Sequence, residues 1–324
     1  GNATGSFVVS VDDITYGDNF TIVISNASGV NDEKLNGTVV VLINGTEFNV
    51  TVVNGSGSAS YYKWLPVGDY DVNASLTVPN YYPMNSSCSF NVGNATGSFV
   101  VSVDDITYGD SFTINVTDAI GVNDERLNGT AIVMINGKKY NVKVTNGEGS
   151  LVVKDVLPAD NYDVVASLTV PNYNPIEYNT SFTIERSDVI ISIEDNIKGT
   201  AGSKVKVTVQ VCDLKGNALK DGVVTIELNG KKYTGFVHNG IAIVEVTLPS
   251  AGTYTAKVYY NTDNTNYNNA TAEFEIESTV APNPNPNPIN NGLNGIGMSN
   301  TGNPLVVLLF ALCLVGIESL RRKF

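Results

Sequence analysis

Alternation of apolar and polar residues dominates the first part of the chain. In the first 92 residues it runs through seven short segments, which are Phe7–Val11, Phe20–Ile24, Val39–Ile43, Phe48–Val53, Ala59–Tyr62, Tyr70–Val78 and Cys88–Val92. A period of two places successive side chains on opposite faces of a strand. Asn-Gly pairs follow two of these segments, and both residues tolerate the positive φ of a tight hairpin. The pattern predicts an all-β sandwich.

The chain repeats itself with an offset of 92 residues. Gly1–Asp18 recurs without change at Gly93–Asp110, and a more distant third copy begins near Ser187. A period near 90 residues is too long for a solenoid and is typical of a small domain used in tandem. We therefore expect three successive sandwiches, formed by residues 1–92, 93–186 and 187–278.

An ordered set of short motifs supports this division. Tyr-Gly-Asp-(Asn/Ser)-Phe-Thr-Ile is followed by Leu-Asn-Gly-Thr, then by Leu-Pro-x-(Gly/Asp)-x-Tyr and a late Asn-Tyr; the third copy keeps the order with Asn239-Gly240, Leu248–Tyr254 and Tyr267–Thr271. The set resembles the bacterial-type (group 3) immunoglobulin-like repeat, and the whole arrangement resembles the adhesin-like surface proteins of methanogenic archaea. The resemblance implies tandem immunoglobulin-like β-sandwiches, and it supplies neither a ligand nor an active site.

The C-terminal residues have a different composition. Alternating Pro and Asn, followed by an Asn/Gly-rich stretch, predict a disordered spacer at residues 279–303, because proline cannot donate to a strand ladder. Residues 304–320 include the apolar run Leu305–Ile317 and are just long enough for a transmembrane helix. The basic residues Arg321, Arg322 and Lys323 make the tail 321–324 cytoplasmic by the positive-inside rule. We expect a single-pass membrane protein at the cell surface, with extracellular N-terminal repeats and a cytoplasmic C-terminus.

Thr301, Gly302, Asn303 and Pro304 come directly before the apolar run. A polar motif, a short apolar stretch and a basic tail also resemble a cell-wall sorting signal, near which a transpeptidase cuts. A plain membrane anchor and a sorted substrate both remain open. The chain opens on Gly1 without a visible signal peptide, so it is either a mature protein or, as the repeats favour, a fragment of a longer one.

Glycosylation sequons are frequent, as expected for an extracellular chain rich in Asn and Thr. The candidate acceptors are Asn2, Asn19, Asn26, Asn36, Asn44, Asn49, Asn54, Asn73, Asn85, Asn94, Asn115, Asn128, Asn179 and Asn269.

Charge and residue counts exclude several classes of function. The 19 basic and 32 acidic residues give a net charge of −13, which would repel a nucleic acid. The single His238 and the scattered Cys88, Cys212 and Cys313 are too few for a histidine-based triad or a zinc cage, and we expect the cysteines to be small buried side chains. The sequence therefore predicts a protein that is not an enzyme, without catalytic residues and without a cofactor.

A calcium site is a weaker hypothesis. Asp12, Asp13, Asp18, Asp32 and Glu33 lie near expected strand ends, where hard oxygen ligands would stiffen a domain junction. The alternative is a set of solvated acidic turns.

The leading interpretation is an adhesin-like stalk that projects a distal binding region from the membrane or wall. Structural envelope components that pack laterally are an alternative. A further alternative is that the repeats themselves bind glycans or other cell surfaces, for which the pairs Tyr61-Tyr62 and Tyr81-Tyr82, together with Trp64, offer aromatic rings.

Overall fold

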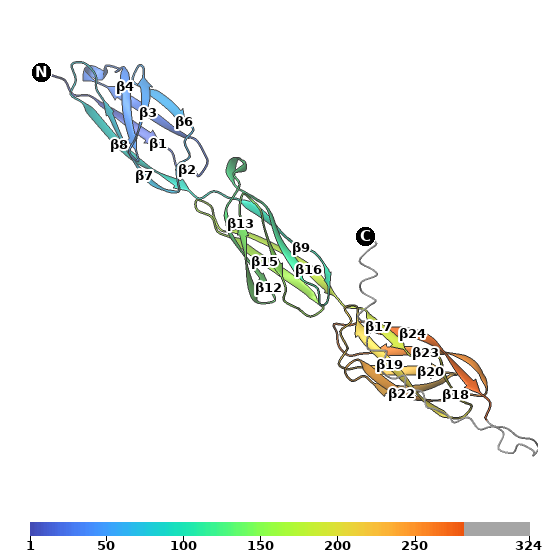
Figure 1. Cartoon of the computed structure of the whole chain (residues 1–324). Coiled ribbons are helices and arrows are strands. Elements are labelled where there is room, and N and C mark those ends of the chain that lie inside the picture. Colours follow the sequence, from blue (N-terminus) through green and yellow to red (C-terminus); the bar gives the residue numbers. More distant parts are fainter. Residues whose placement is uncertain (282–324) are drawn as a thin grey trace, which may run out of the picture. The chain divides into compact units, whose positions relative to one another are not determined.

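The structure is a computed structural model that describes residues 1–281 (Figure 1). In this range it consists of strands, turns and two short 3₁₀ segments, and it contains no α-helix. The described chain divides into two compact units, one of Gly1–Ile106 with Asp110–Ile184 and one of Thr107–Gly109 with the residues from Glu185 onwards. The first unit contains two β-sandwiches and the second contains one. The three predicted repeat ranges, as domain limits, stay a prediction.

The first sandwich pairs a three-stranded sheet, of order β1-β3-β6, with a five-stranded sheet, of order β2-β8-β7-β4-β5. Its elements are β1 (Ser6–Val11), β2 (Ile14–Thr15), β3 (Phe20–Ser28), η1 (Val30–Asp32), β4 (Gly37–Ile43), β5 (Thr46–Val52), β6 (Gly57–Tyr61), β7 (Gly68–Leu76) and β8 (Met84–Gly93).

The second sandwich has the same strand order, β9-β11-β14 against β10-β16-β15-β12-β13. Its elements are β9 (Ser98–Val103), β10 (Ile106–Thr107), β11 (Phe112–Ile120), η2 (Val122–Asp124), β12 (Gly129–Ile135), β13 (Lys138–Val144), β14 (Gly149–Val153), β15 (Asn161–Leu168) and β16 (Ile176–Glu185).

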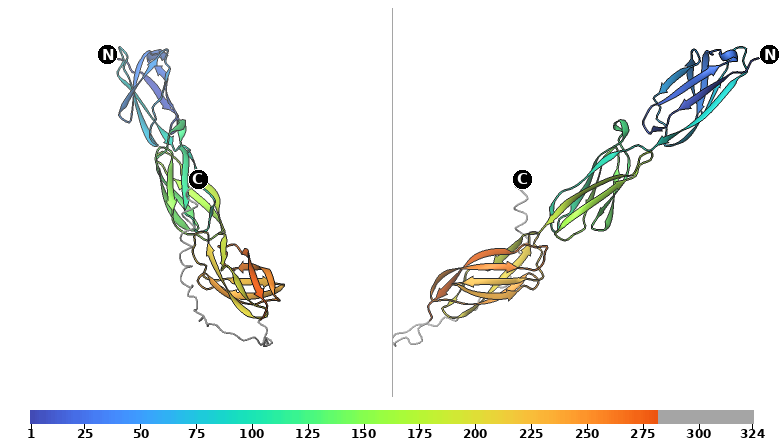
Figure 2. Two further views of the ribbon diagram at one scale, coloured as in Figure 1. Left: turned by 45° about the vertical axis from the view of Figure 1, so that its right-hand side comes forward. Right: turned by 180° about the vertical axis from the view of Figure 1, so that it is seen from behind.

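The third sandwich repeats this order as β17-β19-β22 against β18-β24-β23-β20-β21. Its strands are β17 (Val189–Ile193), β18 (Ile197–Thr200), β19 (Lys204–Asp213), β20 (Val223–Leu228), β21 (Lys231–Phe236), β22 (Ile241–Thr247), β23 (Gly252–Asn261) and β24 (Ala270–Thr279). Figure 2 shows from two further sides that each sandwich consists of two facing layers of strands.

The all-β prediction is confirmed, with one strand more per sandwich than the seven expected from the pattern. In each sandwich a short additional strand, β2, β10 or β18, follows the first strand and belongs to the other sheet. In the first sandwich β1 pairs antiparallel with β3, whereas β2 pairs parallel with β8, with Ile14 opposite Val92. The short strand lies at one edge of the five-stranded sheet, so the start of each sandwich contributes to both sheets. Strand β2 was not visible in the sequence because it contains only two residues.

One of the two predicted Asn-Gly pairs forms a hairpin. The other, Asn54-Gly55, links β5 to β6, which belong to different sheets. Asn44 and Gly45 join β4 to β5 with φ values of 46° and 74°, the geometry that such a two-residue turn requires. Asn229 and Gly230 join β20 to β21 in the same way.

The core of the first sandwich lies between its two sheets and is made of the alternating apolar residues. Phe20 is fully buried, and its ring contacts the rings of Phe48, Tyr61 and Phe90 at centroid distances of 5.3, 5.6 and 6.1 Å. All buried members of this core cluster lie between residues 7 and 92. The first sandwich therefore has a core of its own, which is the requirement for independent folding.

Candidate functional site

A cluster of side chains recurs at one end of each of the first two sandwiches. In the second sandwich, the Tyr173 hydroxyl donates a hydrogen bond to the Glu125 carboxylate and accepts one from the Val122 backbone N–H at 3.1 Å. Gly121 makes this approach possible, because a Cβ there would lie 2.0 Å from the Tyr173 hydroxyl. We call the surface formed by Val122, Asn123, Glu125, Asn172 and Tyr173 the pole of the second sandwich.

The first sandwich has the same cluster 92 residues earlier. The Tyr81 hydroxyl donates to Glu33 at 2.6 Å and accepts from the Val30 N–H at 3.2 Å. Asn31 adopts φ 53° and ψ 36°, almost the values of 51° and 38° found for Asn123. We call the surface formed by Val30, Asn31, Glu33, Asn80 and Tyr81 the pole of the first sandwich.

Within the first unit, the pole of the second sandwich contacts the turn Tyr16–Asp18, which follows β2. The Tyr16 ring meets the Tyr173 ring edge-on, with centroids 5.5 Å apart, and meets the Trp64 ring edge-on at 5.8 Å. The Asn123 side-chain amide donates to the Gly17 carbonyl oxygen at 3.3 Å. The contacts of Tyr16 with Tyr173 and of Gly17 with Asn123 form a joint between the first two sandwiches, and Trp64 packs on Tyr16 from within the first sandwich.

Two further features of the joint restrict which residues fit it. The Val67 N–H donates to the side-chain oxygen of Asn172 at 3.0 Å. Gly17 has φ 90°, and a Cβ there would lie 2.4 Å from a methyl carbon of Val122. Glycine is therefore required at this position both by its backbone conformation and by the close approach of Val122.

Burial and the nearby carboxylate keep the phenols of the joint protonated. Burial, followed by the hydrogen bond to Glu125, raises the pKa of Tyr173 to about 12. Burial and the negative charge of Glu125 also raise the pKa of Tyr16. Both hydroxyls therefore remain neutral at physiological pH, so Tyr173 acts as a donor to Glu125.

The second unit contains a related aromatic contact. Its segment Thr107–Gly109 carries Tyr108, which corresponds to Tyr16 in the repeat. The Tyr108 ring meets the Tyr267 ring edge-on at a centroid distance of 5.4 Å.

Three of the five acidic residues proposed as calcium ligands, Asp13, Asp18 and Glu33, make local hydrogen bonds. Asp13 lies between β1 and β2 and accepts from the Asn91 N–H at 2.7 Å, and Asp105 accepts from the Thr183 N–H at 2.6 Å in the same way. Asp18 accepts from the Thr15 N–H at 3.2 Å, and Glu33 holds Tyr81. Among residues 1–281, no three acidic, histidine or cysteine side chains are grouped closely enough to hold a metal ion. Calcium binding stays a prediction.

The structure places the sequon asparagines mostly on the surface. Thirteen of the fourteen are exposed, and Asn115, in the middle of β11, is half-buried. Asn36 has an additional local role, because its side-chain oxygen accepts from the Asn54 N–H at 2.6 Å. Exposure makes the sites accessible, and their modification stays a prediction.

The two tyrosine pairs do not form continuous aromatic surfaces. Tyr62 is 85% exposed and Tyr82 is exposed as well. Their neighbours lie inside the sandwich, since Tyr61 packs on Phe48 at 4.7 Å and Tyr81 is buried beneath η1. Only one ring of each pair is therefore available to a ligand.

Residues 1–281 include one histidine and two cysteines. His238 is exposed in the turn before β22, whereas Cys88 and Cys212 are half-buried rather than buried. Burial raises the pKa of the Cys88 thiol. The partial burial of Cys88 and the raised pKa of its thiol both disfavour a reactive thiolate there.

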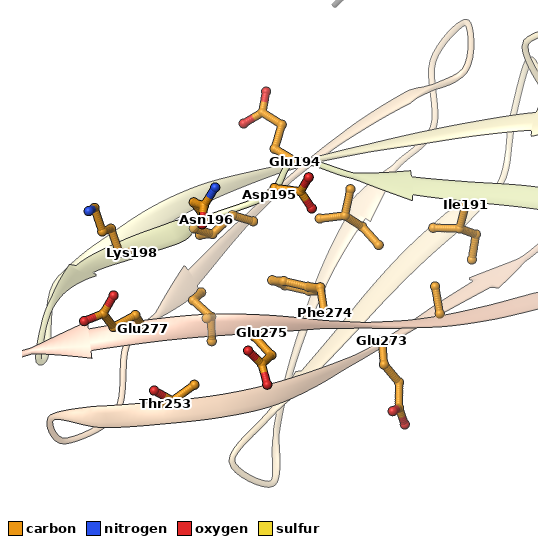
Figure 3. Close-up of a pocket in the computed structure, with 14 residues that line it drawn as sticks. Ile191, Glu194, Asp195, Asn196, Lys198, Thr253, Glu273, Phe274, Glu275 and Glu277 are labelled. Carbon is orange, nitrogen blue, oxygen red and sulfur yellow. The ribbon is translucent and has the colours of Figure 1, made fainter. Parts of the chain in front are cut away.

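A cleft in the third sandwich lies between β17, β18 and β24 (Figure 3). Phe274 points into the space between the strands, and Glu194 and Glu273 point away from each other on opposite sides of it. Glu194 and Glu273 therefore do not converge on one bound molecule as an acid–base pair would.

The predicted anchor and sorting residues, Thr301–Pro304 and Arg321–Lys323, lie outside the described residues, as do the helix at 304–320 and most of the spacer. Within residues 1–281, no helix has the length and apolar character needed to cross a membrane.

Comparison with known proteins gives only structural likenesses. No family model and no curated protein matches the sequence. The chain is similar to the solved tetra-tandem repeat in the extending region of a large adhesion protein, with 16% identity, a TM-score of 0.38, and 85% of this chain and 74% of that chain covered. It is also similar to the FN1–FN3 domains of chicken CNTN1, with 11% identity, a TM-score of 0.26, and 86% and 100% covered. Native alpha-2-macroglobulin of E. coli gives 9% identity and a TM-score of 0.25, with 84% and 23% covered. Likenesses of this size say nothing of what the chain binds.

Proposed function

We propose that the chain is a cell-surface stalk of the adhesin type, which holds a distal binding region away from the membrane or wall. The observation that carries the proposal is the joint between the first two sandwiches. Rings, a backbone carbonyl and two asparagine side chains meet there within normal contact distances. A joint with directional contacts limits rotation, as a spacer of defined reach requires.

Surface chemistry and the C-terminal sequence support the same proposal. Nine sequon asparagines lie exposed in the first sandwich. The apolar run Leu305–Ile317 and the following basic residues have the order of an anchor that leaves the repeats outside the cell. The net charge of −13 favours separation from neighbouring acidic chains rather than unspecific association.

The test is protease treatment of intact cells that make the protein. Residues 1–278 should be digested without lysis, and deletion of Leu305–Phe324 should move the chain into the medium. A matched control deletes residues 282–303 and should leave the chain attached to the cell. Repeats that resist protease until the cells are lysed would contradict the surface location.

Glycan binding by the first sandwich is a second candidate, favoured by the exposure of Tyr62 and Tyr82. Exposed aromatic rings stack on the apolar faces of sugars. The second sandwich has Lys154 and Asn174 at these positions and is a natural control. A glycan array should then give signals with the first sandwich alone, and Tyr62→Ala should remove them; equal signals from both sandwiches would exclude these tyrosines.

A further inference from the structure

The pole of the first sandwich has the same residues and the same internal geometry as the pole that binds Tyr16. In both poles the tyrosine hydroxyl donates to the glutamate carboxylate and accepts from the valine backbone N–H. The distance of this backbone contact is 3.2 Å at Val30 and 3.1 Å at Val122. The two asparagines that bond across the joint also have counterparts, Asn31 for Asn123 and Asn80 for Asn172.

The contacting groups of this pole are exposed. Val30, the counterpart of the residue that packs against Gly17, is 53% exposed, and Asn31 and Asn80 are exposed too. In the second sandwich, Val122 and Asn172 are half-buried because residues of the first sandwich, Gly17 and Val67, contact them. Asn123 stays exposed although its side chain bonds to Gly17. The pole of the first sandwich therefore presents the methyl groups of Val30 beside the side-chain amides of Asn31 and Asn80. The edge of the buried Tyr81 ring lies next to them.

We infer that the pole of the first sandwich is a docking surface for the Tyr-Gly-Asp turn of another sandwich of this sequence type. The tyrosine ring of the incoming turn would meet Tyr81 edge-on. The glycine would approach Val30 without a Cβ, and its carbonyl oxygen would accept from Asn31. This inference rests on the proposed function as a stalk and adds to it the partner that the first sandwich would bind.

The identity of Gly1–Asp18 with Gly93–Asp110 provides a direct experiment. Placing a second copy of residues 1–92 directly before Gly1 recreates the native junction sequence without any added linker. The new joint differs from the native one only in which pole receives the turn, because the first sandwich replaces the second. The remainder of the chain is kept whole.

Spin labels at cysteines introduced at Thr51 and Lys143, which are equivalent exposed positions on β5 and β13, measure the native joint. The new joint is measured with labels at Thr51 of the added copy and Thr51 of the original. Cys88, Cys212 and Cys313 are replaced by alanine in both chains. Electron–electron double resonance then gives the distribution of the label–label distance in the purified protein.

We expect the new joint to give a distance distribution as narrow as that of the native joint. Val30→Arg in the original first sandwich should broaden it, as Val122→Arg should broaden the native distribution. Val23→Arg, at an exposed site on β3, should change neither. A broad distribution for the new joint overturns the inference, and so does a broad distribution for the native joint, from which the docking geometry is taken. Neither result alters the outcome of protease treatment of intact cells, which tests the surface location separately.

Discussion

The ring of Tyr16 meets the ring of Tyr173 edge-on, with centroids 5.5 Å apart and planes inclined by 75°. Edge-to-face geometry places the positive ring edge of one aromatic against the negative face of the other. Tyr16 follows the last pairing residue of β2, and Tyr173 follows β15, so the contact joins two separate sandwiches. This pair and the hydrogen bonds around it link the two sandwiches.

Loss of the Tyr16 ring should loosen the joint without unfolding either sandwich. Tyr16→Ser removes contacts with Tyr173 and Trp64 that are worth about 0.5–1.5 kcal/mol for each aromatic pair. In residues 1–186, ¹⁵N relaxation should then give shorter and separate rotational correlation times for the two sandwiches. Tyr62→Ser removes a ring that is 85% exposed and serves as the control. Unchanged correlation times in the Tyr16 variant would show that the ring contact does not couple them.

Alkaline pH should weaken the second sandwich through Tyr173. Its pKa is about 12 in the folded chain against the usual 10.0, so the unfolded state binds fewer protons between these values. The free energy of unfolding therefore falls as pH rises from about 10 to about 12, and this contribution is fully present below pH 10.

Removing the carboxylate should lower the pKa of that phenol. Glu125→Gln takes away the charge that favours the protonated hydroxyl, while burial continues to raise the pKa. An NMR titration of ¹³Cζ-labelled tyrosine should therefore place Tyr173 between its usual value and that of the unaltered chain. An unchanged titration midpoint would show that burial alone sets the pKa.

Truncation of the central ring should destabilise the first sandwich strongly. Phe20→Ala removes a fully buried ring that packs on three others, and the expected loss is about 3–5 kcal/mol. Val23→Ala, on the exposed face of the same strand, should cost less than about 0.5 kcal/mol. Urea denaturation followed by the fluorescence of Trp64 measures both. Similar losses for the two variants would contradict the assignment of faces in β3.

Glycan occupancy should follow exposure. Asn44 lies exposed in the hairpin between β4 and β5, whereas Asn115 is half-buried on β11 between β9 and β14. Mass spectrometry of glycopeptides from the native protein should find a glycan at Asn44 and an unmodified Asn115. A glycan at Asn115 with an unmodified Asn44 would reverse the expected order.

The sequence predicted those features that depend on local pattern. Alternation located the strands, and pairs such as Asn44-Gly45 located hairpins, because both signals arise from neighbouring residues. The side-chain contacts of the joint were not predicted, because periodicity along a strand cannot show which groups at the ends of two sandwiches meet. Tyr81 was considered as a ring that could bind glycans. One feature of the sequence could have indicated the joint. The motifs Tyr-Gly-Asp and Val-Asn-Asp-Glu are both polar, and both recur unchanged at the offset of 92 residues.

Small-angle scattering of residues 1–186 tests the stalk most directly. A stalk requires that the joint of Tyr16 with the pole of the second sandwich keeps successive sandwiches end to end. The account predicts a maximum dimension close to twice that of residues 1–97 measured alone, at physiological salt. A maximum dimension close to that of one sandwich would contradict the stalk and favour lateral packing into an envelope coat.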